Sequence, residues 1–227
     1  SFPFFQTNGV RSAIAIAIIF YCYPFIWCKK PKRWFLGIIF ASGFHYTAFL
    51  LLPFYWILKR NWGVWLPGIL LFISVLLSTK KNIAVFFITS AVDYLPPIYR
   101  HYSENILARI QDFGWGFGYI WYLIVGVFII FNWNRVAIIG SHAVVIRNAY
   151  FFGIVILIGA YQFWAIGRLA WFFSISSILF WPLVIKYFRK NIATMILIFV
   201  VGAYFALFAH ALITGSHDAI PYQSILS

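Results

Sequence analysis

The chain has 227 residues, of which 64% are hydrophobic, 23% aromatic and only 9% charged. A soluble globular domain carries about a quarter charged residues, so this composition excludes a soluble fold and predicts that lipid surrounds most of the chain. The net charge of +13, from 17 Lys and Arg against 4 Asp and Glu, does not indicate a nucleic-acid partner. The basic residues lie between long apolar runs and not along one face, which is typical of topology signals and of lipid or phosphate contacts.

Apolar runs that are long enough to enter a bilayer follow one another along the chain, each with a polar or basic edge. A membrane-spanning helix needs roughly 20 mostly apolar residues. The predicted segments are 12–27, 34–58, 62–78, 116–131, 148–166, 169–187 and 192–213. A shorter run, 83–95, is an eighth candidate. The predicted fold class is therefore all-α, a polytopic integral membrane protein with about seven or eight membrane-entering helices in a single transmembrane domain over residues 1–227.

The short run 83–95 decides the expected topology. If it crosses, the side that holds the cluster 29–33 also holds Lys80, Lys81, Arg135, Arg147, Lys186, Arg189 and Lys190. The far side then keeps Arg11, Lys59, Arg60, Arg100, Arg109 and Arg168. This arrangement fits the positive-inside rule better than a segment that does not cross, so the crossing is our hypothesis. The longest polar stretch, 96–115, is then an extracytoplasmic loop.

Arginines at the outer ends of helices are the main candidates for chemistry. Arg11 opens the first predicted span and Arg168 opens the segment 169–187, and the positive-inside rule explains neither on the outer side. Guanidinium groups match phosphate oxygens, so two or three could bind a diphosphate and stabilise it as it leaves. The alternative is ordinary snorkelling to the interface. Four loop residues are weaker candidates for substrate binding: Tyr99, Arg100, Tyr102 and Arg109.

Two short stretches echo each other, because RNAYFFGI at 147–154 is followed by RLAWFFSI at 168–175. Two copies are too few for a repeat architecture. An interfacial arginine followed by aromatic belt residues is the simpler interpretation of both.

Two histidines are candidates for a general base. His45 lies near the middle of the predicted span 34–58, where a polar side chain is costly and suggests function. The alternative is a neutral imidazole that is hydrogen-bonded to a neighbouring helix. His101 lies beside Arg100 in the outer loop, and a histidine there titrates near neutral pH.

Metal and nucleotide chemistry find little support in the sequence. Four acidic residues without a clustered pair, and the lack of a His-x-x-x-His motif, offer too few ligands for a magnesium cage. No GxxxxGK loop occurs, so an ATP-driven pump is not expected. Cys22 and Cys28 fall on different helix faces and predict neither a disulfide nor a zinc site. We expect no metal and no cofactor.

Four blocks of sequence resemble the EpsG family of Wzy-like polysaccharide polymerases. NGVRSAIA at 8–15 resembles the family's "gxRqaiA" helix start, and ASGFHYTA at 41–48 resembles its "lasxfHxsal" helix. RLAWFF at 168–173, leading to Trp181-Pro182, looks like the later "RxxxYF…iP" segment, and IPY at 220–222 looks like the C-terminal "iPY". Family members usually carry several helices before the arginine helix, and Trp171 stands where they often have Tyr. The chain therefore resembles the C-terminal part of a longer polymerase.

The resemblance implies a bacterial inner-membrane glycosyltransferase that makes O-antigen or exopolysaccharide. It would polymerise oligosaccharide repeat units from undecaprenyl diphosphate at the periplasmic or outer face, without metal, and with a chain-length regulator as a further partner. In this interpretation Arg11 and Arg168 bind the diphosphate, and His45 or His101 acts on the acceptor. The alternatives are a polysaccharide ligase, a membrane O-acyltransferase, a non-enzymatic flippase or transporter of lipid-linked glycans, and an inert fragment.

Overall fold

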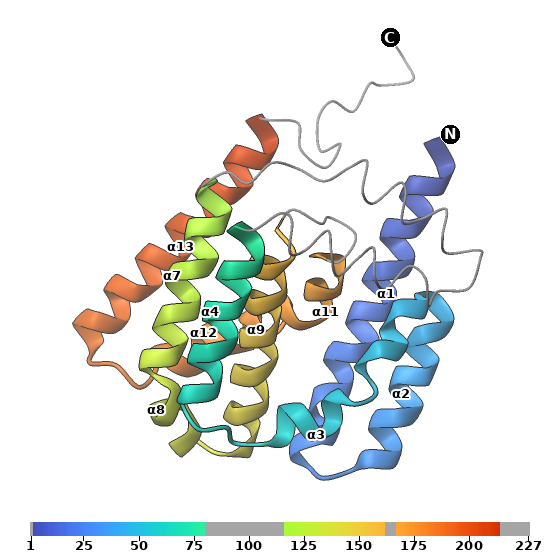
Figure 1. Cartoon of the computed structure of the whole chain (residues 1–227), viewed down its shortest axis with the longest axis horizontal. Helices are drawn as coiled ribbons and strands as arrows, with labels where there is room; N and C mark the ends of the chain where they lie inside the picture. The colour runs from blue at the N-terminus through green and yellow to red at the C-terminus, as the bar shows by residue number, and fades with distance from the viewer. Residues whose placement is uncertain (1, 80–115, 162–166, 214–227) are drawn as a thin grey trace.

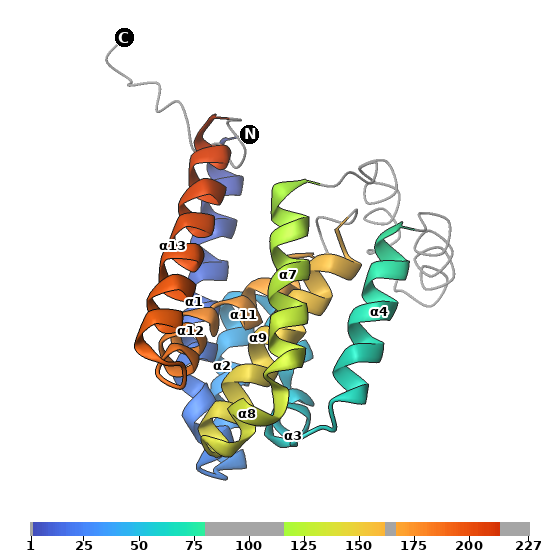
Figure 2. The same cartoon turned by 90° about the vertical axis from the view of Figure 1, so that its left-hand side faces the viewer.

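The computed structural model describes residues 2–79, 116–161 and 167–213, and every regular element in these ranges is a helix (Figures 1 and 2). The expected segment 83–95 and the expected loop 96–115 lie outside the described residues. In chain order the helices are α1 (Phe2–Trp27), α2 (Pro31–Phe44), the 3-10 helix η1 (Tyr46–Leu51), α3 (Phe54–Lys59), α4 (Trp65–Thr79), α7 (Phe117–Phe131), α8 (Trp133–Ile138), α9 (Ser141–Gly159), the 3-10 helix η2 (Arg168–Ala170), α11 (Trp171–Ser174), α12 (Ser177–Ile185) and α13 (Lys190–Ile213).

Four stretches of the described helices are long and apolar enough to cross a membrane: Gly9–Trp27, Ser141–Gly159, Arg168–Ile185 and Lys190–His210. The helices α4 and α7 are apolar but shorter. An all-helical bundle with these spans agrees with a polytopic membrane protein. The total of seven or eight membrane-entering helices stays a prediction.

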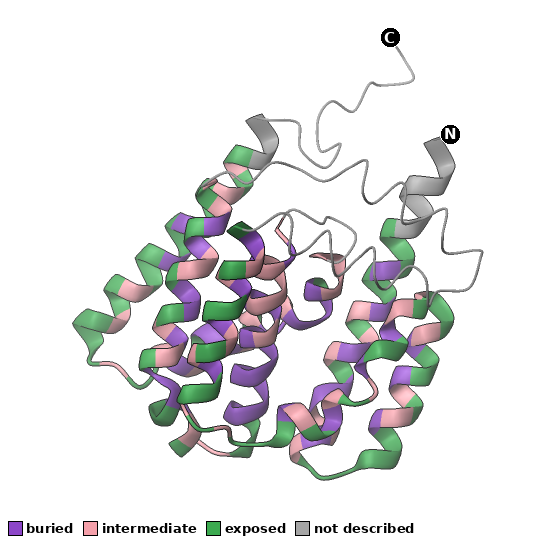
Figure 3. Ribbon diagram, in the orientation of Figure 1, coloured by how far each residue is buried: buried purple, intermediate pink, exposed green. Residues whose placement is uncertain are grey.

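Helix α9 is the centre of the bundle (Figure 1). It contacts α1, α3, α4, α7, α8, α11, α12 and η2. Every residue from Ala143 to Phe151 is buried, and a helix that is buried on all sides must be surrounded by other helices (Figure 3). The predicted span 148–166 was placed too far toward the C-terminus, because Arg147 and Asn148 look like a polar edge but lie inside the helix.

Two groups of helices pack on opposite sides of α9. Val145 and Ala149 join a buried cluster formed by α1, α2, η1, α3 and α11. Ile146 and Tyr150 join a second cluster formed by α4, α7, α8, α12 and α13. The two clusters meet through α9, which therefore fixes how the elements of one group stand relative to those of the other.

The segment that was expected to span continuously over 34–58 doubles back instead. Helix α2 ends at Phe44, and His45 adopts an extended backbone with φ −142° and ψ 106°. Pro53, which lacks a backbone N–H, lies between η1 and α3 and does not support a continuous helix. The chain returns through η1 and α3 toward the turn between α1 and α2 (Figure 1). The predicted continuous span is therefore wrong.

The basic residues collect at one end of the bundle, which we call the basic end; it is the lower end in Figures 1 and 2. It holds the α1–α2 turn, the end of α3, helix α8 and the α12–α13 turn, and these carry Lys29, Lys30, Lys32, Arg33, Lys59, Arg60, Arg135, Lys186, Arg189 and Lys190. The expected far-side position of Lys59 and Arg60 is therefore wrong, since the return of 46–59 brings them to the basic end. Helix α4 ends and α7 begins at the opposite end, so the described helices alone account for this charge asymmetry. The crossing of 83–95 stays a prediction.

Candidate functional site

The end opposite the basic end brings His45 and the beginning of α11 together. The imidazole of His45 makes an edge contact with the ring of Phe172, with ring centroids 5.9 Å apart and an interplanar angle of 83°. Phe172 lies one helical turn after Arg168. The buried hydroxyl of Tyr23 in α1 donates a hydrogen bond of 2.8 Å to the carbonyl oxygen of Phe172. Helices α1, α2 and α11 therefore hold the candidate residue His45 close to the segment that begins at Arg168.

The residues that follow His45 orient its ring. The hydroxyl Oγ1 of Thr47 lies 2.7 Å from His45 Nδ1, within a hydrogen bond. The ring of Tyr46 stacks beside the imidazole, with centroids 5.7 Å apart and an interplanar angle of 20°. Tyr46 is 69% exposed, so most of its side chain is open to the surroundings. Sequence reasoning missed the roles of Tyr46 and Thr47; their position directly after the candidate histidine was the one available signal.

The electrostatic environment favours the neutral form of the His45 imidazole. His45 lies in the connection between α2 and η1, outside the four stretches that are long enough to span a membrane. Partial burial lowers the pKa of His45 below its usual 6.5, and the positive charge of Arg168 lowers it further. Neutral imidazole is the form that accepts a proton, so this environment favours a base at neutral pH.

Arg168 is the first residue of η2 and of the candidate span 168–185. Its side chain is partly buried, with Nε shielded from solvent. The positive charge of Arg168 acts on His45, and Arg168 also interacts electrostatically with Tyr46. The structure thus brings two residues that the sequence singled out, far apart in the chain, into one environment.

Arg11 shares this end of the bundle. It lies exposed within α1, in the first turn of the candidate span Gly9–Trp27. With a rise of about 1.5 Å per residue, Arg11 stands about 24 Å above Trp27, and Phe44 stands about 20 Å above Pro31 on the neighbouring helix α2. Arg11 and His45 therefore lie at a similar height on adjacent helices.

The other predicted site residues fall outside the described residues: Tyr99, Arg100, His101, Tyr102 and Arg109. Their roles stay predictions. Among the described residues, no group of three His, Cys, Asp or Glu side chains is placed to hold a metal ion.

A polar network that the sequence did not predict lies inside the basic half of the bundle. Arg147 is fully buried; its Nη1 donates 2.6 Å to the carbonyl oxygen of Trp133, and its Nη2 donates 3.1 Å to Asn61 Oδ1. Asn148 donates to the carbonyl oxygens of Leu58 and Arg60 at 2.9 and 2.8 Å. Because these groups satisfy one another, the network fastens the α3–α4 connection to α9. It is a structural feature, and the expected inner-loop position of Arg147 is wrong.

The sequence matches the model of the EpsG family over residues 1–224, which is essentially the whole chain. No curated protein and no solved structure matches it. The resemblance seen in the sequence blocks is therefore confirmed at the level of the family.

Proposed function

Because this chain belongs to the EpsG family of Wzy-like polysaccharide polymerases, we propose that it joins oligosaccharide repeat units carried on undecaprenyl diphosphate. The reaction takes place at the extracytoplasmic face of the bacterial inner membrane. One observation carries the proposal: His45 and Arg168 share an environment at the end of the bundle opposite the basic end. By the positive-inside rule, the basic end faces the cytoplasm and this site faces outward.

The proposed reaction is a displacement at the anomeric carbon of the donor glycan. A hydroxyl of the acceptor sugar attacks this carbon, a new glycosidic bond forms, and the bond from the carbon to the diphosphate oxygen breaks. Arg168 and Arg11 bind the departing diphosphate, because negative charge grows on its oxygens as the bond breaks. This assignment needs no metal ion.

His45 is the proposed base for the acceptor hydroxyl. With Nδ1–H donating to Thr47 Oγ1, the Nε2 atom of a neutral imidazole carries the lone pair that accepts the proton. The exposed ring of Tyr46 stacks beside the imidazole and offers an aromatic surface to a sugar. His101 remains the alternative base for the acceptor. Four other residues remain proposed contacts to the saccharide: Tyr99, Arg100, Tyr102 and Arg109.

A reconstituted assay tests the proposal. The purified chain in liposomes is incubated with lipid-diphosphate-linked repeats, without metal or nucleotide, and the products are separated on a gel. We expect a ladder with one-repeat spacing. Arg168→Ala should reduce the polymer by about 100-fold or more, since a lost donor to a departing charge costs about that much. Lys32→Ala, an exposed cation at the basic end, is the matched control and should leave the ladder unchanged.

Other products would point to the alternatives. Transfer of one glycan to a different acceptor, or of an acyl group, would indicate a ligase or an O-acyltransferase. Movement of the lipid-linked glycan across the vesicle without a new glycosidic bond would indicate a flippase. An unchanged ladder in both Arg168→Ala and Arg11→Ala would refute the assigned arginine roles.

A further inference from the structure

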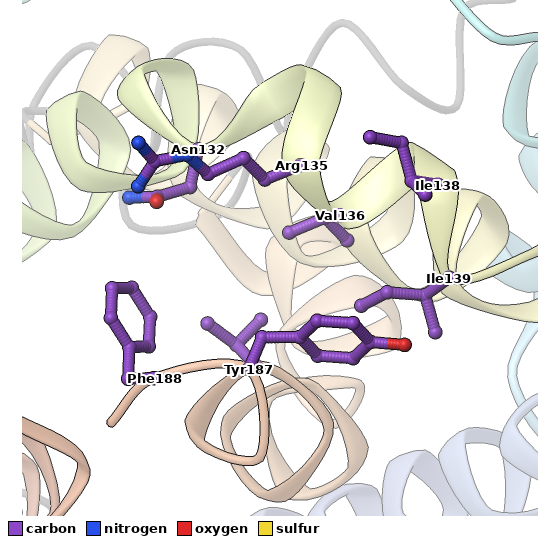
Figure 4. A pocket seen from close by; sticks show the side chains of 8 residues that line it. Asn132, Arg135, Val136, Ile138, Ile139, Tyr187 and Phe188 are labelled. Carbon is purple, nitrogen blue, oxygen red and sulfur yellow. The ribbon is translucent and has the colours of Figure 1, made fainter. Parts of the chain in front are cut away.

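A pocket of about 260 Å³ lies at the basic end, between α8 and the turn from α12 to α13 (Figure 4). Most of its lining is apolar and comes from Val136, Ile139, Val184 and Phe188. Arg135 and Asn132 supply the polar lining, and in Figure 4 the guanidinium and the amide point toward the same edge of the pocket. The pocket thus joins an apolar interior to a cationic edge.

The surroundings of the pocket are strongly cationic. Lys186, Arg189 and Lys190 flank the lining residues Tyr187 and Phe188 in the chain. The described part of the chain contains no carboxylate, since the four acidic residues fall in 80–115 and 214–227. A ligand with a negative headgroup therefore complements this end of the bundle, whereas a cationic or neutral headgroup does not.

The rim of the pocket points to a lipid and not to a soluble metabolite. Two large side chains of its lining are open to the surroundings: Ile138 is 83% exposed and Tyr187 is 60% exposed. In a membrane protein such a rim faces acyl chains, so a chain can enter the pocket from the side.

We propose that this pocket binds an anionic phospholipid of the leaflet at the basic end. Part of one acyl chain fills the apolar interior, and the phosphate pairs with Arg135 at the cationic edge. A guanidinium can donate two hydrogen bonds to a phosphate, and basic pockets between helices on the cytoplasmic side suit anionic headgroups. This site lies at the opposite end of the bundle from His45 and Arg168, so the proposal does not depend on the proposed polymerase activity.

Native mass spectrometry of the full chain in a neutral detergent tests the proposal by counting retained lipids. The probes are phosphatidylglycerol and phosphatidylcholine with identical acyl chains. We expect the wild-type chain to retain phosphatidylglycerol about fivefold better or more, and Arg135→Gln to weaken its binding about fivefold. Lys32→Gln removes an exposed cation at the same end and should bind like wild type. Equal retention of the two lipids by the wild-type chain would overturn the proposal, and so would unchanged retention by Arg135→Gln.

Competition on the wild-type chain separates the possible sources of the phosphate without any variant. Inorganic phosphate and glycerol phosphate should fail to displace long-chain phosphatidylglycerol, because they leave the apolar interior unfilled. Displacement by either at a similar concentration would overturn the lipid assignment in favour of a simple anion site. Displacement by a polyprenyl phosphate at equal concentration would also overturn it, since the site would then belong to the carrier lipid.

Discussion

The guanidinium carbon of Arg147 lies 3.7 Å from the centroid of the Trp133 ring, while Nη1 donates to the carbonyl oxygen of the same tryptophan at 2.6 Å. Arg147 is 0% exposed, so a cation rests on an aromatic face inside the bundle. Its other donors reach the amide oxygens of Asn61 and Asn148. A buried cation of this kind is stabilised by the ring quadrupole and by aligned oxygen dipoles.

Removing this guanidinium should destabilise the bundle. Arg147→Ala leaves the carbonyl oxygen of Trp133 and the amide oxygen of Asn61 without their donor, and it opens a cavity in α9. We expect a loss of about 3–5 kcal/mol, measured as a lower midpoint of unfolding in detergent. Lys32→Ala should unfold at the wild-type midpoint. An Arg147→Ala variant as stable as wild type would show that the network contributes nothing.

Gly140 should not tolerate a side chain. It precedes α9 with φ at 135° and ψ at 178°, a conformation that is essentially restricted to glycine. Gly140→Ala should therefore cost about 1–3 kcal/mol in the free energy of unfolding. Gly202 in α13 has open space at its Cβ position, so Gly202→Ala should be neutral or stabilise by up to about 1 kcal/mol. Equal effects of the two substitutions would contradict the backbone explanation.

Close packing of α9 against α11 should control the candidate site. A Cβ atom at Gly153 would lie 3.1 Å from the backbone nitrogen of Ser174 and 3.2 Å from Phe173 Cβ. Gly153→Ala should push α11 away and move Phe172 relative to His45, at a cost of about 1–3 kcal/mol. We expect lower polymer yield at a temperature where the variant is still folded. Gly68→Ala, with nothing near its Cβ position, is the control.

Thr47 should act as a positioning residue for His45. Thr47→Val keeps the side-chain shape but removes the group that lies 2.7 Å from Nδ1. We expect polymer formation to fall by about 10-fold or more, which is the size of effect found for partners that orient a metal-bound imidazole. Thr47→Ser restores a hydroxyl and should recover most of the rate. If valine and serine behave alike, the hydrogen bond does not matter for the reaction.

The pH dependence should follow the lowered pKa of His45. Protonation removes the lone pair that the proposed base needs, so activity is full while the imidazole is neutral. Since burial and Arg168 lower this pKa below 6.5, activity should persist below pH 6.5 and decline only at more acidic pH. The stability of the fold should change with pH in the same direction. The fold favours the neutral form of His45, so the free energy of unfolding decreases as the pH falls.

A titration of labelled histidine checks this assignment. Nuclear magnetic resonance should give a midpoint below 6.5 for His45 in the wild-type chain. Arg168→Gln removes one positive charge and should raise this midpoint, whereas Lys32→Gln should not change it. A midpoint at or above 6.5 would exclude the electrostatic coupling of the two residues.

Hydropathy predicted those helices whose ends carry charge or turn residues. The predicted segment 116–131 agrees with α7, and 192–213 agrees with α13. It did not predict the break at His45, because the residues on both sides of it are as apolar as a continuous span. The candidates His45 and Arg168 came from the sequence, but the contact of His45 with Phe172, one helical turn after Arg168, depends on helices far apart in the chain.

The two echoing stretches show why local sequence was not sufficient. Arg147 and Arg168 are each followed, after one intervening residue, by an alanine and three aromatic residues. The first is fully buried beneath Trp133, and the second is partly exposed at the start of η2. What separates them is the packing of the α3–α4 connection and α8 over Arg147, which no short pattern in the chain predicts.

Arg147 and Asn148 donate hydrogen bonds to four oxygen atoms of residues earlier in the chain: the carbonyls of Leu58, Arg60 and Trp133 and the amide of Asn61. Arg147 also donates to the amide oxygen of Asn148, its neighbour in α9. An arginine at the centre of an isolated helix costs about 2.5–3.5 kcal/mol to insert into a bilayer. During translation, however, these acceptors have already been made when α9 emerges. The order of synthesis therefore allows α9 to insert together with the oxygen atoms that bind its polar side chains, and not as a solitary span.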